Sequence, residues 1–458
     1  MKQIDFESGN IKQNIFFSAV PMLAAQLLHL LYNIVDRIFI GRIPGEGADA
    51  LAGVGLCFPV VIMILAFAGM YGSGGGPLCS MELGREDPEK AERIMNTSFS
   101  LLLGTSILVT AAGFLFMKPM LLLFGASEVT LRYAVDYLSI YLLGTVFAMI
   151  ASGITPFINA QGFTSTGMMS VFIGAITNMI LDPVFIFAMG LGVRGAAIAT
   201  VISQGLSAAF CLRFLTSEKA DLRIRRSQVL HPDRALSGKI IWLGFSMFIT
   251  HFTNSLVTIV CNRMLSIYGG DLYISIYAIL SSVRQVFDVP TGAITEGSSP
   301  VVSYNYGARR SEKTRESIRL MCLAAFVYSL TAWGLISLFP SAFIRIFTSD
   351  THVIATAVPL LHIYFFAFVF QALQYGGQTT FRSLGMKNHA IFFSLFRKVI
   401  IVVPLTILFP KLFPLLGASP IQGIFAAEPV SNVIGGTACF TTMYILIYRK
   451  LRKGLFPD

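Results

Sequence analysis

The chain has 458 residues, of which 55% are hydrophobic and 13% are charged, and its mean hydropathy is +0.71. A soluble protein carries about 25% charged residues, so this composition excludes a water-soluble fold and predicts a protein that crosses the membrane many times. A β-barrel is also excluded, because no segments of about ten residues alternate apolar and polar side chains.

Twelve apolar segments follow one another along the chain, each long enough to cross a bilayer, which needs about 20 residues. They lie at residues 14–40, 51–81, 94–118, 127–152, 163–189, 194–216, 236–268, 273–303, 314–340, 352–377, 388–412 and 420–448. We therefore expect an all-α polytopic membrane protein with twelve transmembrane helices.

The formal net charge of +10 follows the expected membrane topology. With a cytoplasmic N-terminus, about 25 of the 34 Lys and Arg residues fall in inner loops and about five in outer loops, as the positive-inside rule requires. Both termini should then face the cytoplasm, and the basic charge gives no reason to expect nucleic-acid binding. Residues 1–14 lack the features of a cleaved signal peptide.

The sequence contains no pattern that indicates enzyme or cofactor chemistry. The six cysteines are scattered singly, which predicts neither disulfides nor a zinc site. The glycine-rich segment at 69–77 lacks the Lys-Ser/Thr pair of a phosphate-binding loop, and we interpret it as a place of close helix packing or as a flexible helix. We therefore expect a protein that is not an enzyme, has no cofactor and takes its energy from an ion gradient.

The two halves of the chain repeat each other. A single constant shift in residue number places Gly84 on Gly307, residues 140–147 on 363–370, and Gly162 on Gly385. Because each half has six spans, the halves share one topology and are parallel repeats. We predict an N-terminal lobe at 1–216, a cytoplasmic linker at 217–239 and a C-terminal lobe at 240–458, with a cavity that opens alternately to either side of the membrane.

Four polar residues of the first half are expected at one depth in the membrane. Asp36 lies near the outer end of the first span, Asn178 and Asp182 share one face of the fifth, and Thr200 lies just inside the sixth. At 1.5 Å per residue, Asp36, Asp182 and Thr200 should lie roughly 8–10 Å below the outer surface, with Asn178 about one turn deeper. A carboxylate at this depth needs a partner or a proton.

This polar group suits the binding of a small cation. Two neighbouring acids can carry a proton, and carboxylate, amide and hydroxyl oxygens are equally suitable ligands for Na⁺. The residue types do not decide between the two ions. The alternative is a static hydrogen-bonded core that only orients three helices.

The second half does not repeat the acid group, but it contains other ionisable residues within its spans. Arg284 and Asp288 are spaced to neutralise each other, while Asp288, Glu296 and Glu428 could attract cationic substrates. A cavity lined by aromatic residues and Met suits flat apolar cations. The first two spans offer Gln26, Tyr32 and Met63 as candidate residues that line such a cavity. Ordinary helix packing is the alternative for each of them.

The segments "VDRIFIG", "ALAGVGL", "NMILDPVFIF", "GVRGAAIATVIS" and "SYNYGAR" together resemble the bacterial MATE (multidrug and toxic compound extrusion) transporters over essentially the whole chain. The resemblance implies an antiporter in the bacterial cell membrane that expels cationic drugs and dyes in exchange for H⁺ or Na⁺. It also implies a cation-coupling site at Asp36, Asn178, Asp182 and Thr200, and a bending proline at Pro21. Because one chain contains both lobes, we expect it to act as a monomer.

Two other functions remain as alternatives. A flippase of lipid-linked saccharides belongs to the same superfamily, but such proteins often have two more helices and a basic cavity, whereas the ionisable residues in these spans are expected to be mainly acidic. A membrane-embedded enzyme could use Asp36 and Asp182 as an aspartyl pair, but no catalytic motif accompanies them and the repeat favours alternating access.

Overall fold

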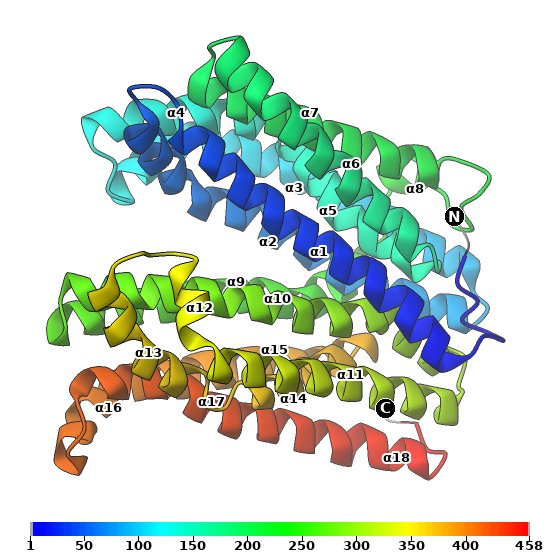
Figure 1. Ribbon diagram of the computed structural model, residues 1–458. Helices are drawn as coiled ribbons and strands as arrows, with labels where there is room; N and C mark the ends of the chain where they lie inside the picture. The colour runs from blue at the N-terminus through cyan, green and yellow to red at the C-terminus, as the bar shows by residue number, and fades with distance from the viewer. Residues whose placement is uncertain (1–2, 457–458) are drawn as a thin grey trace. The chain divides into compact units, whose positions relative to one another are not determined.

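The computed structural model describes residues 3–456, without the side chains of residues 251 and 271, and this part of the chain consists of helices joined by turns and loops, with no strand (Figure 1). Ten helices are long and apolar enough to cross a membrane, and two bent helix pairs bring the number to twelve. The predicted all-α fold with twelve membrane spans is confirmed.

The chain forms two compact units, which we describe separately. The N-terminal unit contains residues 3–9 and 20–248, and the C-terminal unit contains residues 10–19 and 249–456. The predicted linker at 217–239 therefore lies inside the N-terminal unit. Both unit boundaries fall within long helices, α1 (Ile11–Gly41) and α9 (Arg234–Tyr268).

The remaining helices of the first half follow the six expected spans. They are α2 (Gly47–Gly84), α3 (Pro88–Leu123), α4 (Glu128–Leu143), α5 (Thr145–Ala160), α6 (Thr164–Pro183) with the π-helical turn η1 (Val184–Ala188), α7 (Gly192–Leu215) and the short α8 (Arg226–Leu230).

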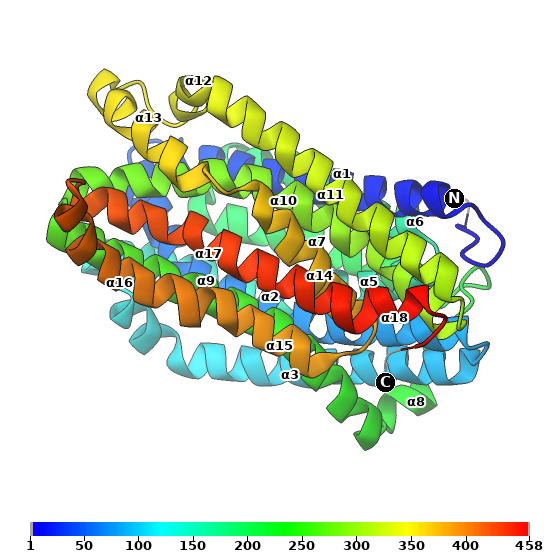
Figure 2. The ribbon, with the colours of Figure 1, turned by 90° about the horizontal axis from the view of Figure 1, so that it is seen from below.

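The second half has the same order of spans. Its helices are α10 (Asp271–Gly307), α11 (Ser311–Leu338), α12 (Pro340–Arg345), α13 (Thr351–Phe365), α14 (Val369–Ser383), α15 (Lys387–Leu395) with the π-helical segment η2 (Phe396–Val402), α16 (Val403–Leu412), the 3₁₀ turn η3 (Phe413–Leu416), and α17 (Pro420–Met443) with η4 (Tyr444–Tyr448) and α18 (Arg449–Arg452). In the C-terminal unit α17 packs between α14 and α16 (Figure 2).

The internal repeat extends to details of the backbone at the same constant shift. Helix α2 ends at Gly84 and α10 at Gly307. Shortly after these ends, Glu86 and Arg309 are the only non-glycine residues of the described chain with positive φ, at 61° and 57°. Gly162 and Gly385 match in the same way, with φ of 86° and 74°. The predicted repeat is confirmed.

The fourth span of each half is bent rather than continuous. Helices α4 and α5 meet at 57°, and α13 and α14 meet at 45°. Gly144 stands at the first bend, where a Cβ atom would lie 2.5 Å from the Val201 side chain of α7. The sequence predicted one span at each of 127–152 and 352–377 but not these bends, because a single small residue does not interrupt an apolar run.

Helix packing in the N-terminal unit depends on glycines in the segment at 69–77. A Cβ atom on Gly74 would lie 2.2 Å from the Ile240 carbonyl oxygen of α9, and one on Gly75 would lie 2.4 Å from the Phe157 ring of α5. Small residues allow helices in membranes to approach this closely. The segment therefore packs as the sequence indicated.

The segment between α7 and α9 is fixed to the first turns of α3 by Glu92 and Asn96. The buried Asn96 amide donates to the Arg223 carbonyl at 3.0 Å and accepts from the Arg225 amide at 2.9 Å. Glu92 accepts from the Arg223 amide at 3.1 Å and pairs with the Arg225 side chain. Nearby, the N-terminal residue Gln3 donates to Gln161, so the start of the chain lies at the same end of this unit (Figure 1).

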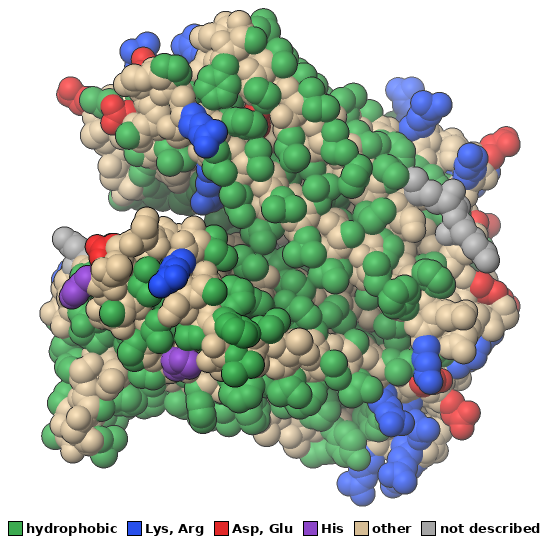
Figure 3. Space-filling view, in the orientation of Figure 1, with side chains coloured by type: hydrophobic (Ala, Val, Ile, Leu, Met, Phe, Trp, Pro, Cys, Tyr) green, Lys and Arg blue, Asp and Glu red, His purple; other side chains and the backbone are tan. Residues whose placement is uncertain are grey.

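Surface side chains separate by type along the helices of both units. On the face shown in Figure 3, hydrophobic side chains cover the middle, whereas most Lys, Arg, Asp and Glu side chains gather toward the two sides, where the helices end in Figure 1. This pattern is the one a lipid bilayer requires, because its core offers no water to solvate charge.

Candidate functional site

The four polar residues expected at one depth meet in the N-terminal unit, and we call them the N-terminal acid site. Asn178 and Asp182 lie on α6, where the Asn178 amide donates to an Asp182 carboxylate oxygen at 3.2 Å. The same amide approaches the Thr200 hydroxyl of α7 at 3.4 Å. Asp36 of α1 lies beside Asp182, close enough for the two carboxyl groups to interact.

Burial leaves several oxygens of this site without a hydrogen-bond donor. Asp182 is 0% exposed and Asn178 is 2% exposed. In the described part of the chain, no donor reaches Asp36 Oδ1, Asp182 Oδ2 or Asn178 Oδ1. Buried acceptors normally receive a hydrogen bond. These oxygens do not, so they could bind a proton or coordinate a small cation.

Local backbone features place these residues. Pro183 ends α6 directly after Asp182 and is followed by η1, and π-helical turns widen a helix at functional positions. Helix α7 can approach because residue 195 is glycine. A Cβ atom there would lie 2.6 Å from the backbone carbon of Phe185.

Sequence reasoning missed three polar residues around the site. Tyr137 of α4 lies near Asp36 and Thr200. Tyr141, one turn later, stacks on Tyr137 with ring centroids 6.0 Å apart and accepts from Gln204 of α7 at 3.4 Å. The two tyrosines are spaced i, i+4 inside an apolar span, and this spacing was the available signal.

On α1 the residues before Asp36 form a polar strip. The Tyr32 hydroxyl lies 3.3 Å from His29 Nε2, and the Asn33 amide donates to the His29 carbonyl at 2.7 Å. Tyr32 also lies close enough to Asp36 and Asp182 to interact with their charges. The predicted hinge Pro21 is inside α1, next to the boundary between the units at Val20.

Two other candidate residues of this unit lie outside the acid site. Gln26 of α1 is exposed, and Met63 of α2 is 41% exposed. Among the described residues, neither side chain makes a hydrogen bond with the acid site. Their predicted contact with a substrate stays a prediction.

The three candidate acids of the C-terminal unit are all paired with cations. Asp288 and Glu428 both contact Arg284, at 3.5 and 3.2 Å, and Glu428 also contacts Arg397 and Lys398. Glu296 pairs with Arg382 of α14. The expectation that the ionisable residues within the spans are mainly acidic is wrong, since Arg284, Arg382, Arg397 and Lys398 lie in helices α10, α14 and η2.

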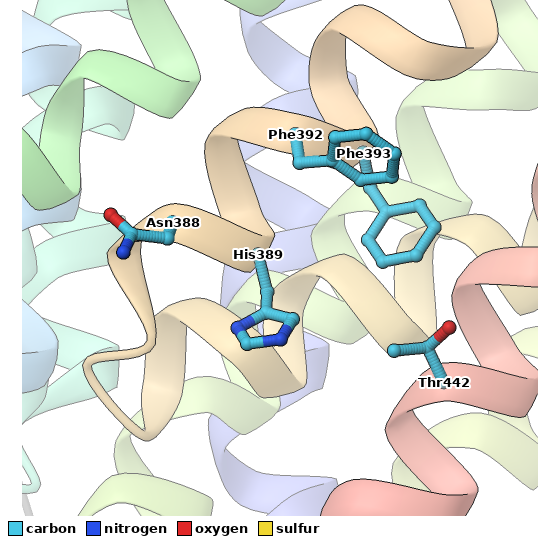
Figure 4. A pocket seen from close by; sticks show the side chains of 5 residues that line it. All are labelled: Asn388, His389, Phe392, Phe393 and Thr442. Carbon is cyan, nitrogen blue, oxygen red and sulfur yellow. The ribbon is translucent and has the colours of Figure 1, made fainter.

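A pocket of about 380 Å³ lies on the C-terminal unit near the start of α15 (Figure 4). It is lined by Asn388, His389, Phe392, Phe393 and Thr442. Phe392 is 49% exposed. The lining includes none of the candidate site residues, and its aromatic character suits contact with lipid.

The comparison with known families decides the identity of the fold. The MatE family profile matches the chain twice, over residues 21–184 and 246–408, once in each repeat. The chain belongs to the MatE family. The "Multidrug export protein MepA" of Staphylococcus haemolyticus is 24% identical over 455 residues, covering 99% of this chain and 96% of the relative.

Further relatives agree with this membership. The MepA protein of Staphylococcus aureus is 22% identical over 441 residues, covering 96% of this chain and 95% of the relative. A solved structure described as the outward-facing conformation of a multidrug resistance MATE family transporter has a TM-score of 0.90 at 21% identity. It covers 99% of both chains. At that identity the structural likeness establishes the MatE fold.

Proposed function

We propose that this MatE protein is a secondary active multidrug antiporter that expels organic cations and other xenobiotics in exchange for H⁺ or Na⁺. The observation that carries this proposal is the set of three buried oxygens, on Asp36, Asn178 and Asp182, that no donor among the described residues reaches. The names of the relatives, multidrug export proteins, support the choice of substrate class.

The acid site couples ion binding to helix position. Two carboxylates so close together in a low dielectric repel each other unless a cation lies between them. A bound H⁺ or Na⁺ holds Asp36 of α1 against Asp182 of α6, and its departure releases that attraction. Pro21 removes a backbone hydrogen bond from α1 and permits the helix to bend there, so the ion biases two positions of α1.

The direction of transport follows from the proposed membrane orientation. The end of the N-terminal unit that holds Gln3 also holds the basic segment with Arg223 and Arg225, which fits a cytoplasmic location. Cations entering the acid site from the opposite end would then move inward as the substrate moves out. We propose that the chain works in this way as a monomer in the bacterial cell membrane, with no resident cofactor and no enzymatic step.

Inside-out membrane vesicles provide the test. We would set up an inside-acid pH gradient, add ethidium, and record the dissipation of the pH gradient with and without Na⁺. Wild-type protein should release protons on addition of ethidium, and Asp36→Asn and Asp182→Asn should reduce this to the level of vesicles without the protein. Asp49→Asn changes an exposed acid of α2 in the same way and serves as the matched control.

The outcomes separate the possible functions. A response that requires Na⁺ and is lost in both variants keeps the site and identifies the ion. Wild-type activity in Asp36→Asn would refute the switch. No response to any organic cation, combined with binding of a polyprenyl-linked saccharide, would favour the flippase.

A further inference from the structure

The C-terminal unit contains a buried group of charges that the cation-coupling proposal does not use. It consists of Arg284 and Asp288 on α10, Arg397 and Lys398 on η2, and Glu428 on α17. We call these five residues the C-terminal charge cluster. Gln371 of α14 connects two of them, accepting from Arg284 at 2.5 Å and donating to Asp288 at 2.8 Å.

Three cations meet on a single carboxylate oxygen in this cluster. Glu428 Oε1 lies 3.2 Å from Arg284 Nη2, 3.0 Å from Arg397 Nη1 and 2.8 Å from Lys398 Nζ. Arg284 also reaches Asp288 at 3.5 Å, a longer and weaker pair. No further acid lies within ion-pair distance of these cations in the described part of the chain.

The cluster therefore has more positive than negative charge. Arg284, Arg397 and Lys398 contribute three positive charges, and Asp288 and Glu428 contribute two negative ones, which leaves a net charge of +1. An unpaired charge is costly at this level of burial. Arginine does not lose its proton in proteins, so the excess requires either a neutral Lys398 or an anion.

Unsatisfied donors favour the anion. Arg284 is 5% exposed and its Nη1 has no acceptor among the described residues. Asn432, one turn after Glu428 on α17, is 0% exposed. Its oxygen accepts from Arg397 at 2.6 Å, whereas its amide nitrogen has no acceptor in the same part of the chain. A neutral Lys398 would leave both donors unsatisfied, whereas an anion beside Arg284 could accept from its Nη1.

A contact with an aromatic ring stabilises the positive charge of Arg284 only in part. Its guanidinium carbon lies 4.9 Å from the centroid of the Tyr364 ring, within cation–π distance. A ring face attracts the cation but does not replace a hydrogen-bond acceptor for the Nη1 protons. The aromatic wall also gives an apolar neighbour to any organic group that accompanies an anionic head.

We propose that the C-terminal charge cluster binds a single monovalent anion, either chloride or the carboxylate group of a transported compound. A planar guanidinium matches a carboxylate in shape and charge. The side chains of Lys398 and Asp288 are 14% and 23% exposed, which makes them the most exposed members of the cluster. The carboxylate case rests on the proposed efflux function and extends its substrates to zwitterions.

Binding is tested first on the purified full chain in detergent. Thermal unfolding is followed at constant ionic strength while chloride, benzoate or the neutral analogue benzamide is increased. We expect a saturable rise in unfolding temperature with chloride or benzoate and none with benzamide. Lys398→Met should abolish the rise because it brings the cluster to zero net charge, and Glu428→Gln should enlarge it.

Two further variants separate an anion site from a merely structural role for Lys398. Lys398→Arg keeps the charge and should retain the anion-dependent rise. Lys411→Met removes an exposed lysine of α16 and should behave as wild type. An equal rise in Lys398→Met and wild type, or no saturable rise in wild type, would overturn the proposal.

Transport then identifies the source of the anion. Efflux of a rhodamine with a free carboxyl group is compared with efflux of its methyl ester in the same vesicles. If the carboxylate occupies the cluster, Lys398→Met should lower the efflux rate of the free acid relative to that of the ester. The expected decrease is about tenfold, the loss that corresponds to one charge-assisted hydrogen bond. An unchanged ratio with lost chloride stabilisation assigns the site to chloride.

The ester also keeps the two proposals distinguishable. Absence of ester efflux in the wild type would contradict cation antiport and leave the binding result standing. Normal ester efflux without any anion binding would contradict the anion site alone.

Discussion

Replacing Gly195 by alanine tests whether the contact between α7 and η1, the turn that follows α6, sets the geometry of the acid site. The new Cβ atom would lie 2.6 Å from the Phe185 carbon, 2.7 Å from its oxygen and 2.9 Å from the Ile186 nitrogen. All three are backbone atoms, so no side-chain rotation relieves the clash. Cβ contacts below 3.0 Å essentially never occur, so the two backbones must separate by at least 0.4 Å, and by 0.8 Å to reach ordinary contact at 3.4 Å.

This displacement occurs on the same helix as Thr200 and close to Asp182. The Asn178–Thr200 contact, already long at 3.4 Å, would be lost. We expect a loss of stability of about 1–3 kcal/mol from overpacking. Ethidium-driven proton release should fall by about tenfold or more, since errors near 1 Å in a functional site have effects of this size.

Thermal unfolding of the purified protein and proton release in vesicles measure the two effects. Gly205→Ala is the matched control, because it makes the same change on α7 where the nearest atom, in the Phe147 ring, is 3.8 Å away. Wild-type stability and proton release in Gly195→Ala would refute the claim that this contact positions the site.

Three further changes have defined outcomes. Gly244→Ala would place a Cβ atom 1.7 Å from the Met70 carbonyl oxygen. It should therefore prevent α9 from packing on α2, seen as loss of folded protein in size-exclusion chromatography; a normal elution profile would contradict this. Asn96→Ala should lower the free energy of unfolding by about 1–3 kcal/mol and speed tryptic cleavage near Arg225 in inside-out vesicles. Unchanged cleavage would contradict the claim that Asn96 anchors the segment between α7 and α9. Thr200→Val should reduce proton release less than Asn178→Ala, because the Thr200 contact at 3.4 Å is weaker than the Asn178–Asp182 bond at 3.2 Å; the reverse order would contradict this ranking.

The sequence was informative wherever a pattern extended over many residues. Twelve long apolar runs predicted the spans, and the constant shift between the halves aligned Gly162 with Gly385, both of which have positive φ in the structure. The grouping of Asp36, Asn178, Asp182 and Thr200 could be predicted because each was placed by its distance from a span end. Their role in coupling stays a prediction.

Features that depend on local helix geometry could not be predicted in this way. The bend between α4 and α5 depends on how closely Val201 approaches Gly144, a tertiary contact without a sequence pattern. Arg397 and Lys398 lie in the π-helical segment η2, where the α-helical period of 3.6 residues no longer assigns side chains to faces. Comparison of the two repeats showed only that the second half does not repeat the acid group, and so it missed both cations.

The division of the chain into units also constrains how the protein can be made. The N-terminal unit includes residues up to 248, and the C-terminal unit includes residues 10–19. During synthesis, the first unit cannot be completed until the start of α9 has left the ribosome. Residues 10–19 must wait for partners whose translation begins only at Ile249. The two halves therefore mature together, and a chain stopped after α7 would lack part of its own first unit.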